Sequence, residues 1–281
     1  MPASLRMGAT LMLAVVAACG VATPATTAGP SVATSAAPTT SSTATAIDQI
    51  RTRGTLVVAI RVEAPPANRA MGDPAHAQKR ALEMAVATLV ANAVFGASVK
   101  VQFQSQGGDR VAALAQGADL AMVTDSSAAR DRAAVTPPYA ANAVVIAVRD
   151  GGPIARVEDL AAKSVGVAQD ELVTRDLAQT FFQSKNVSAT LDTYVGVNGG
   201  AMALESDKAV AFVGDGIGVA FVAADRKLKI IAEVTPRPYV IAIRQNAPDL
   251  ATAIATALQA ALQSGAVKDA AAKAGFPYTA P

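Results

Sequence analysis

The chain has 281 residues, of which 52% are hydrophobic, 16% are charged and 4% are aromatic, and its formal net charge is +2. No run of basic residues is longer than two, so the composition does not indicate a nucleic-acid-binding protein. The length suits one large domain or two small ones. Cys19 is the only cysteine, which excludes disulfide bonds within the chain.

The N-terminus has the pattern of a bacterial secretory signal. Arg6 is its only charge, and residues 7–18 form an apolar segment that is too short to span a bilayer. Small residues stand directly before Cys19, and this arrangement resembles the bacterial lipoprotein signal, in which the cysteine is lipidated and becomes the new N-terminus. The alternative is a chance cysteine in a cleavage region of the A-x-A type. We expect a signal peptide at residues 1–18 and a lipid anchor on Cys19, at the extracytoplasmic side of the cell membrane.

The segment that follows has the composition of a linker. Residues 20–46 consist almost wholly of Ala, Thr, Ser, Pro and Val and carry no charge. Such a segment can bury little apolar surface and shows neither helical nor strand periodicity. We therefore predict a disordered tether over residues 19–46, between the anchor and a globular body.

The first half of the body alternates between strand and helix patterns. Residues 56–60 form a continuous apolar run, which is typical of a strand covered on both faces. Residues 78–93 carry apolar side chains at helical spacing, and residues 109–116 also favour a helix. Two further strands are predicted at residues 99–103 and 119–123. This order is typical of a parallel sheet with helical crossovers.

A second set of elements follows residue 139. We predict strands near residue 194 and at 144–148, 165–167, 209–213 and 239–243, and helices at 157–162, 171–183, 201–205 and the C-terminus. Residues 214–218, with the sequence GDGIG, are interpreted as a turn at a strand end, because they lack the context of a dinucleotide-binding fingerprint.

Prolines near residues 139 and 237 mark two crossings between these sets. The pattern predicts an α/β protein with two lobes joined by a double hinge. Lobe 1 comprises residues 47–140 and 237–281, and lobe 2 comprises residues 141–236. In such sheets ligands bind beyond the carboxyl ends of the strands, which directs attention to the residues there.

The sequence shows no constellation typical of an enzyme or a metalloprotein. His76 is the single histidine and lies in a polar loop, where a surface role is expected. A nucleophile elbow, a phosphate-binding loop and a metal-ligand cluster of useful spacing are all missing from the sequence. We therefore expect no catalytic residue, no cofactor and no metal.

Charged and hydroxyl side chains do follow the predicted strands, and they suit a zwitterionic ligand. An arginine binds a carboxylate with two parallel hydrogen bonds, hydroxyl groups complete its shell, and an aspartate in the opposite lobe binds an ammonium group. The alternative is that these are ordinary surface charges at strand ends. The candidates are Arg61, Thr124, Ser126, Arg130 and Asp215.

Five loose motifs, in the right order, resemble the extracellular solute-binding proteins of family 3, the polar amino-acid receptors of ABC importers. They are IDQIRTRGTLVV at 47–58, DRVAALAQGADL at 109–120, VTPPY at 135–139, VEDLAAKSVGV at 157–167 and LESDKAVAFVGD at 204–215. The resemblance implies the type II periplasmic-binding-protein-like fold, with two α/β lobes joined by a two-stranded hinge. It also implies a monomeric receptor that closes over an amino-acid-like ligand and delivers it to an ABC permease.

The resemblance assigns roles to individual residues. Arg130 matches the arginine that binds the ligand carboxylate, Asp215 matches the aspartate that binds its ammonium group, and Arg132 faces solvent. Arg61 and Arg110 match arginines of the glutamate/aspartate-binding branch, although Arg61 has the alternative of pairing with Glu63. The sequence departs from the family pattern in two places, and the second departure weakens the glutamate assignment. The usual ligand-stacking aromatics are replaced at residues 63–67 and 104–108, and the second-lobe turn reads AQDE at 168–171.

Two other classes of function stay open. One is a sensory receptor on the same fold, which passes its closed form to a membrane partner. The other is an enzyme of the dehydratase type, for which Glu63 and Asp170 are the acid/base residues that the chain offers.

Overall fold

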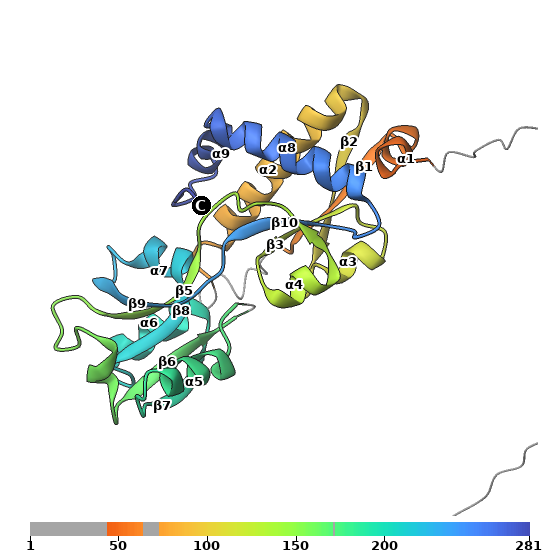
Figure 1. The fold of residues 1–281 in the computed structure, drawn as a ribbon. Helices are drawn as coiled ribbons and strands as arrows, with labels where there is room; N and C mark the ends of the chain where they lie inside the picture. The colour runs from red at the N-terminus through yellow and green to blue at the C-terminus, as the bar shows by residue number, and fades with distance from the viewer. Residues whose placement is uncertain (1–43, 64–72, 171) are drawn as a thin grey trace, which may run out of the picture. The chain divides into compact units, whose positions relative to one another are not determined.

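The structure is a computed structural model that describes residues 44–63, 73–170 and 172–281, and all structural statements refer to these residues. They form two five-stranded mixed sheets, with the strand orders β2-β1-β3-β10-β4 and β7-β6-β8-β5-β9 (Figure 1). The predicted signal peptide, the Cys19 anchor and all but the last three residues of the predicted tether lie outside the described residues.

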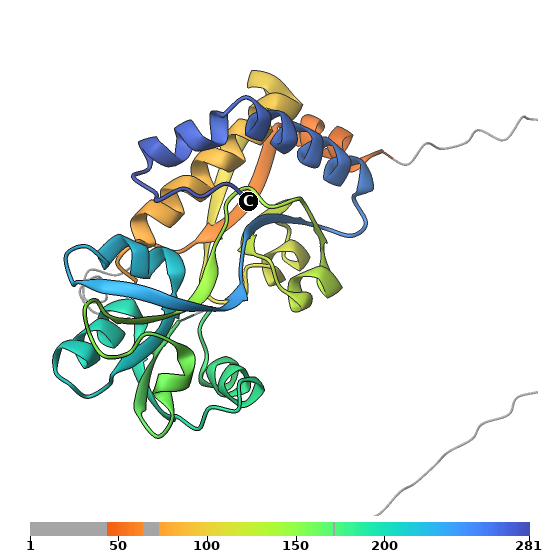
Figure 2. The same cartoon turned by 60° about the vertical axis from the view of Figure 1, so that its left-hand side comes forward.

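The first sheet is built mainly from continuous apolar runs. Strand β1 pairs in parallel with β2 and β3, whereas β10 runs antiparallel to β3 and β4. Helices α2, α8 and α9 cover one face of this sheet, and α3 and α4 lie on the other (Figures 1 and 2). Its strands are β1 (Thr55–Arg61), β2 (Lys100–Gln106), β3 (Leu120–Thr124), β4 (Ala134–Val135) and β10 (Tyr239–Ile243).

Local signals begin and end the helices of the first lobe. Thr45 accepts a hydrogen bond from the backbone N–H of Asp48 and so caps the first helix, which ends at Gly54 with a φ of 69°. Pro248 stands at the first position of α8, where its missing N–H costs nothing. The helices are α1 (Ala46–Arg53), α2 (His76–Phe95), the 3-10 turn η2 (Gly96–Ser98), α3 (Ala112–Ala115), α4 (Ser127–Arg132), α8 (Pro248–Gln263) and α9 (Ala266–Lys273).

Helix α2 is the central helix of the first lobe. Leu82, Val86 and Val90 recur at helical spacing and are buried against the sheet and α8. The helix with its η2 extension is long and apolar enough by composition to cross a membrane, with a hydropathy of 1.5. Helices α8 and α9 meet that criterion only together, and a bend of 78° separates them. Because α2, α8 and α9 pack against the first sheet, we interpret all three as core helices of the first lobe.

The second sheet has the same mixed character. Strand β6 pairs in parallel with β7 and β8, and β5 runs antiparallel to β8 and β9. Helix α5 packs on one face, whereas α6 and α7 pack on the other. The elements are β5 (Ala143–Arg149), η3 (Val157–Leu160), β6 (Ser164–Gln169), α5 (Arg175–Ser184), β7 (Thr190–Val195), α6 (Gly196–Glu205), β8 (Ala211–Asp215), α7 (Gly216–Val222) and β9 (Leu228–Pro236).

The chain passes between the two sheets twice, and the two connections pair with each other. The backbone N–H of Tyr239 donates to the carbonyl of Ala140, and the N–H of Tyr139 donates to the carbonyl of Tyr239, both at 2.9 Å. The two tyrosine rings are buried with their centroids 5.9 Å apart. The predicted α/β fold of two lobes with a two-stranded hinge is confirmed, while the lobe boundaries stay a prediction.

One sequence interpretation is wrong. Residues 214–218 are not only a turn, because β8 runs to Asp215 and helix α7 begins at Gly216. The physical reason is the Asp215 side chain, which accepts a hydrogen bond from the N–H of Gly218 and so caps a helix that the glycines obscure. Helix α6 likewise begins at Gly196, five residues before its predicted start. A methyl group at Gly200 would lie 2.6 Å from the ring of Phe212, so packing explains that glycine.

Candidate functional site

Asp215 lies at the carboxyl end of β8, as the sequence predicts, and its side chain is fully buried. One carboxylate oxygen, Oδ2, is 2.5 Å from the ammonium nitrogen of Lys79 and accepts from the N–H of Gly218 at 2.8 Å. The other oxygen, Oδ1, accepts from the side-chain amide of Asn142 at 2.8 Å. Asp215 therefore does hold an ammonium group, and that group belongs to the chain itself.

Lys79 comes from the first turn of α2, in the other lobe, and only 2% of its side chain is exposed. Its ammonium group also donates to Asp73 at 2.7 Å. Burial by itself would lower the pKa of Lys79, but the carboxylates of Asp215 and Asp73 outweigh that effect and the pKa is raised. Burial acts to raise the pKa of Asp215, and the charge of Lys79 overrides it, so that pKa is lowered. Both groups stay charged.

Arg61 ends β1 and is buried, but it points at a second side chain of α2. Its Nε and Nη2 atoms are both 2.9 Å from Oε1 of Glu83, and its backbone N–H donates to Oε2 of Glu83 at 3.0 Å. Arg110 is also buried; it donates from Nε to the carbonyl of Met122 at 2.6 Å and lies 3.9 Å from Glu83. Glu83 thus supplies a carboxylate to the two arginines that the resemblance assigns to a ligand carboxylate.

Arg130 and Arg132 lie on different faces of α4. Ser126, Ala129 and Arg132 are three residues apart and line a cavity, whereas Arg130, which is turned by about 100° from Ala129 around the helix axis, is not part of its lining. Arg130 pairs with Asp125 and keeps 57% of its side chain exposed. Arg132 pairs with Asp109 at 2.5 Å. Arg132 therefore lines the cavity while 46% of its side chain stays exposed, and Arg130 does not line it. Which of the two binds a ligand stays a prediction.

The cavity beside α4 has a volume of about 400 Å³. It contains three of the predicted residues, Arg110, Thr124 and Ser126, and Leu172 of the second lobe. Ser126 also caps α4 by accepting from the N–H of Ala129 at 3.1 Å. The complete lining is Gly108, Asp109, Arg110, Val111, Val123, Thr124, Ser126, Ala128, Ala129, Arg132 and Leu172.

Asp170 is one of the two carboxylates considered for acid/base chemistry. It is half-buried at the end of β6, and its Oδ1 atom accepts from the N–H groups of Leu172 and Val173 at 2.7 and 2.8 Å. Burial and the nearby charge of Asp215 raise the pKa of Asp170 to about 6. Glu63, the other carboxylate, is exposed after β1.

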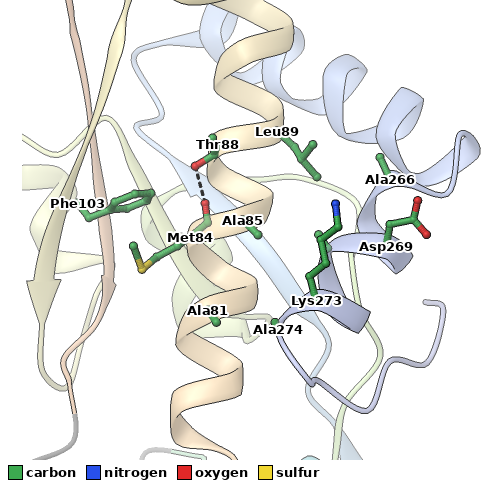
Figure 3. A pocket seen from close by; sticks show the side chains of 11 residues that line it. Ala81, Met84, Ala85, Thr88, Leu89, Phe103, Ala266, Asp269, Lys273 and Ala274 are labelled. Carbon is green, nitrogen blue, oxygen red and sulfur yellow. Dashed lines mark hydrogen bonds between the residues drawn. The ribbon is translucent and has the colours of Figure 1, made fainter.

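A larger cavity, of about 650 Å³, lies outside the predicted site (Figure 3). It is a groove between α2, α9 and β2, where Met84 and Phe103 lie close together and Ala81, Ala85 and Leu89 form an apolar wall. Its charged lining residues are Asp269 and Lys273 of α9. None of the predicted site residues takes part in it, so size alone does not identify the functional cavity.

No protein-family model and no curated protein matches the chain. Solved structures do match. A mutant of ArgBP from T. maritima has a TM-score of 0.58 at 22% identity, covering 81% of this chain and 97% of that one. The fold is that of the type II periplasmic binding proteins.

Two further structures share this fold. One is the probable amino-acid ABC transporter extracellular-binding protein ytmK from Bacillus subtilis, with a TM-score of 0.61 at 17% identity over 78% of this chain and 96% of that one. The other is the GluR0 ligand-binding core from Nostoc punctiforme in complex with L-glutamate. Its TM-score is 0.57 at 18% identity, over 78% of this chain and 98% of that one.

Within this periplasmic-binding-protein fold, Lys79 and Glu83 pair with the strand-end residues Asp215 and Arg61, and neither was singled out from the sequence. Lys79 and Glu83 lie on the buried face of α2, in the same helical register as Leu82 and Val86. A signal for them existed, because the apolar period of the helix places both charges at positions that should be buried. A buried charge requires a partner, and that requirement could have linked Lys79 to an aspartate.

Proposed function

We propose that the chain is the extracytoplasmic receptor of an ABC importer, of the family 3 solute-binding class, and that it captures a small amino-acid-like solute by hinge closure. The observation that carries the proposal is the cavity of about 400 Å³ beside α4, which is lined by residues of the first lobe and by Leu172 of the second. Its volume falls in the range of small-molecule sites, and its polar lining residues come from the carboxyl end of β3 and the loops around it. The two-stranded hinge supplies the means of opening and closing.

The proposal includes the cellular location of the receptor. A signal peptide at residues 1–18 and lipidation of Cys19 would anchor a monomer to the cell membrane, with an ABC permease as its partner. The pattern of small residues before Cys19 supports this anchor. Metabolic labelling with a fatty-acid analogue tests it, since a Cys19→Ala variant should lose the label.

The ligand class is supported by the solved structures that share the fold, one bound to arginine and another in complex with glutamate. A glutamate or aspartate ligand is the finer form of the proposal and rests on Arg61 and Arg110. The contacts of both residues with Glu83 weigh against that finer form.

A thermal-shift screen tests the proposal, with isothermal titration calorimetry on each hit. Small amino acids and their carboxylic-acid analogues serve as ligands for the full chain, and we expect one or a few to raise the melting temperature. Ala128→Trp should fill the cavity and abolish that rise. Ser127→Trp is the matched control, because Ser127 is the exposed neighbour that does not line the cavity. The proposal is wrong if no ligand shifts the melting temperature, or if Ala128→Trp leaves every hit unchanged.

A further inference from the structure

Helix α2 carries one cationic and one anionic side chain, Lys79 and Glu83, on one buried face. Lys79 and Glu83 are four residues apart, so their side chains lie one turn apart along the same side of the helix. Lys79 pairs with Asp215, and Glu83 pairs with Arg61. Asp215 is the residue that the resemblance assigns to a ligand ammonium group, and Arg61 is one that it assigns to the carboxylate of an acidic ligand.

The carboxylate of Asp215 has no place for a second ammonium group. Its two oxygens already accept from Lys79, Gly218 and Asn142, and the side chain is inaccessible to solvent. The surrounding atoms are tightly packed. A methyl group at Gly218 would lie 3.3 Å from Asp215 Oδ2 and 2.9 Å from Val197. A ligand ammonium could reach Asp215 only by displacing Lys79.

Displacement of Lys79 is unfavourable because two carboxylates hold it. Asp215 lies in the second lobe, whereas Asp73 precedes α2 in the first lobe, at 2.5 and 2.7 Å from the ammonium nitrogen. Moving Lys79 away would leave a buried carboxylate without its counter-charge, unless the ligand replaced that charge in the same position.

Asp215 was expected to bind an ammonium group, whereas the cavity beside α4 carries groups that can bind an anion. Its charged lining residues are two arginines, Arg110 and Arg132, and one aspartate, Asp109, and the hydroxyl groups of Thr124 and Ser126 also lie in the lining. An arginine has five N–H donors, so one that already has a partner can still take part in binding an anion. The lining therefore offers arginine N–H groups and two hydroxyl groups to a ligand carboxylate, beside the carboxylates of Asp109 and Glu83 that the arginines already contact.

We propose that Lys79 is a specificity-determining residue: by occupying Asp215 it restricts the site to carboxylic acids that lack an ammonium group. The inference rests on the proposed function, because it names the ligand class of the cavity beside α4. Lys79 and Asp215 do not line the cavity; Asp170 links them to it, since it lies close enough to Asp215 to feel its charge and accepts from the N–H of Leu172 in the lining. The ligand carboxylate binds in the cavity beside α4, and Lys79 supplies the positive charge that an amino acid would otherwise bring to Asp215.

Matched pairs of ligands test this inference on the full chain by calorimetry. The pairs are L-glutamate with glutarate, L-leucine with 4-methylpentanoate, and L-arginine with 5-guanidinopentanoate. In each pair that binds, we expect the acid without the amino group to bind at least about tenfold more tightly to the wild type. Lys79→Ala should reverse the preference, because the vacated Asp215 then accepts the ligand ammonium. Lys208→Ala, at an exposed lysine, is the control and should leave the preference unchanged.

The design separates the two proposals and does not depend on one variant. If Lys79→Ala does not fold, the double variant Lys79→Met/Asp215→Asn removes both charges, and the preference within each pair should disappear. The inference is wrong if the wild type binds an amino acid as tightly as its partner acid in every pair that binds, and the proposed function then stands. If no compound binds either the wild type or the variants, the proposed function is wrong and the inference with it.

Discussion

The pairs Lys79–Asp215 and Arg130–Asp125 both join a cation to a carboxylate at the end of a strand, but their exposure to water differs. The side chains of Lys79 and Asp215 are 2% and 0% exposed, whereas those of Arg130 and Asp125 are 57% and 15% exposed. A buried pair cannot lose one member without leaving an uncompensated charge, whereas water replaces either member of an exposed pair. Burial, rather than position at a strand end, therefore decides which charged side chains need a partner within the protein.

The largest expected effect comes from breaking the buried pair. Lys79→Met leaves the Asp215 carboxylate buried without its counter-charge, and we expect the free energy of unfolding to fall by about 3–5 kcal/mol. Urea denaturation followed by circular dichroism measures the change. Lys208→Met, at an exposed lysine, is the control and should leave the midpoint close to that of the wild type. Equal midpoints for the two variants would contradict the buried ion pair.

A smaller effect is expected from Asp170, which is less buried than the Lys79–Asp215 pair and less exposed than Arg130. Its pKa is raised to about 6 by burial and by Asp215, above the value of about 4 in an unfolded chain. The folded state therefore holds the proton more tightly, and this residue lowers the free energy of unfolding as the pH rises from about 4 to about 6. Asp170→Asn keeps an oxygen that can accept both N–H groups and should remove that loss, raising stability at pH 7 by up to about 3 kcal/mol.

Unfolding curves at a series of pH values measure the effect of Asp170→Asn. Asp225→Asn, at an exposed aspartate, serves as the control. If the wild type and Asp170→Asn show the same pH dependence between pH 4 and 7, Asp170 does not titrate as described.

The smallest effects are expected at the exposed pairs of α4. Arg130→Ala removes a solvent-facing cation and should change neither the denaturation midpoint nor ligand binding measurably. Arg132→Ala should also leave stability close to that of the wild type, but it should weaken ligand binding because Arg132 lines the cavity. Calorimetry with any ligand found in the thermal-shift screen compares the two. A greater loss of binding for Arg130→Ala would instead support the role that the resemblance assigns to Arg130.

Local patterns predicted much of the fold. The continuous apolar runs of β1, β3 and β10 identified buried strands, and the helical spacing of Leu82 and Val86 identified α2. Strands β4 and β9 and helices α1, α4 and α7 were not predicted. The glycines that begin α7 weaken its helical signal, and the Asp215 cap that fixes it depends on where the preceding strand ends.

The candidate site could be predicted only in part, because its contacts are not local. Lys79 and Asp215 are 136 residues apart, so no short pattern shows that they meet. The motif spacing did not show that Arg132 lines the cavity, because that depends on the face of a six-residue helix. The strand-end rule did place Asp215 correctly, and it was the partner of Asp215 that required the tertiary structure.

A double-mutant cycle for Lys79→Met and Asp215→Asn tests the central claim most directly, since that claim is that Lys79 occupies Asp215. Urea unfolding of the wild type, the two single variants and the double variant gives the coupling energy between the side chains. We predict a coupling of about 2 kcal/mol or more, with the double variant more stable than Lys79→Met alone. Additive effects, with no coupling between the two substitutions, would contradict the account.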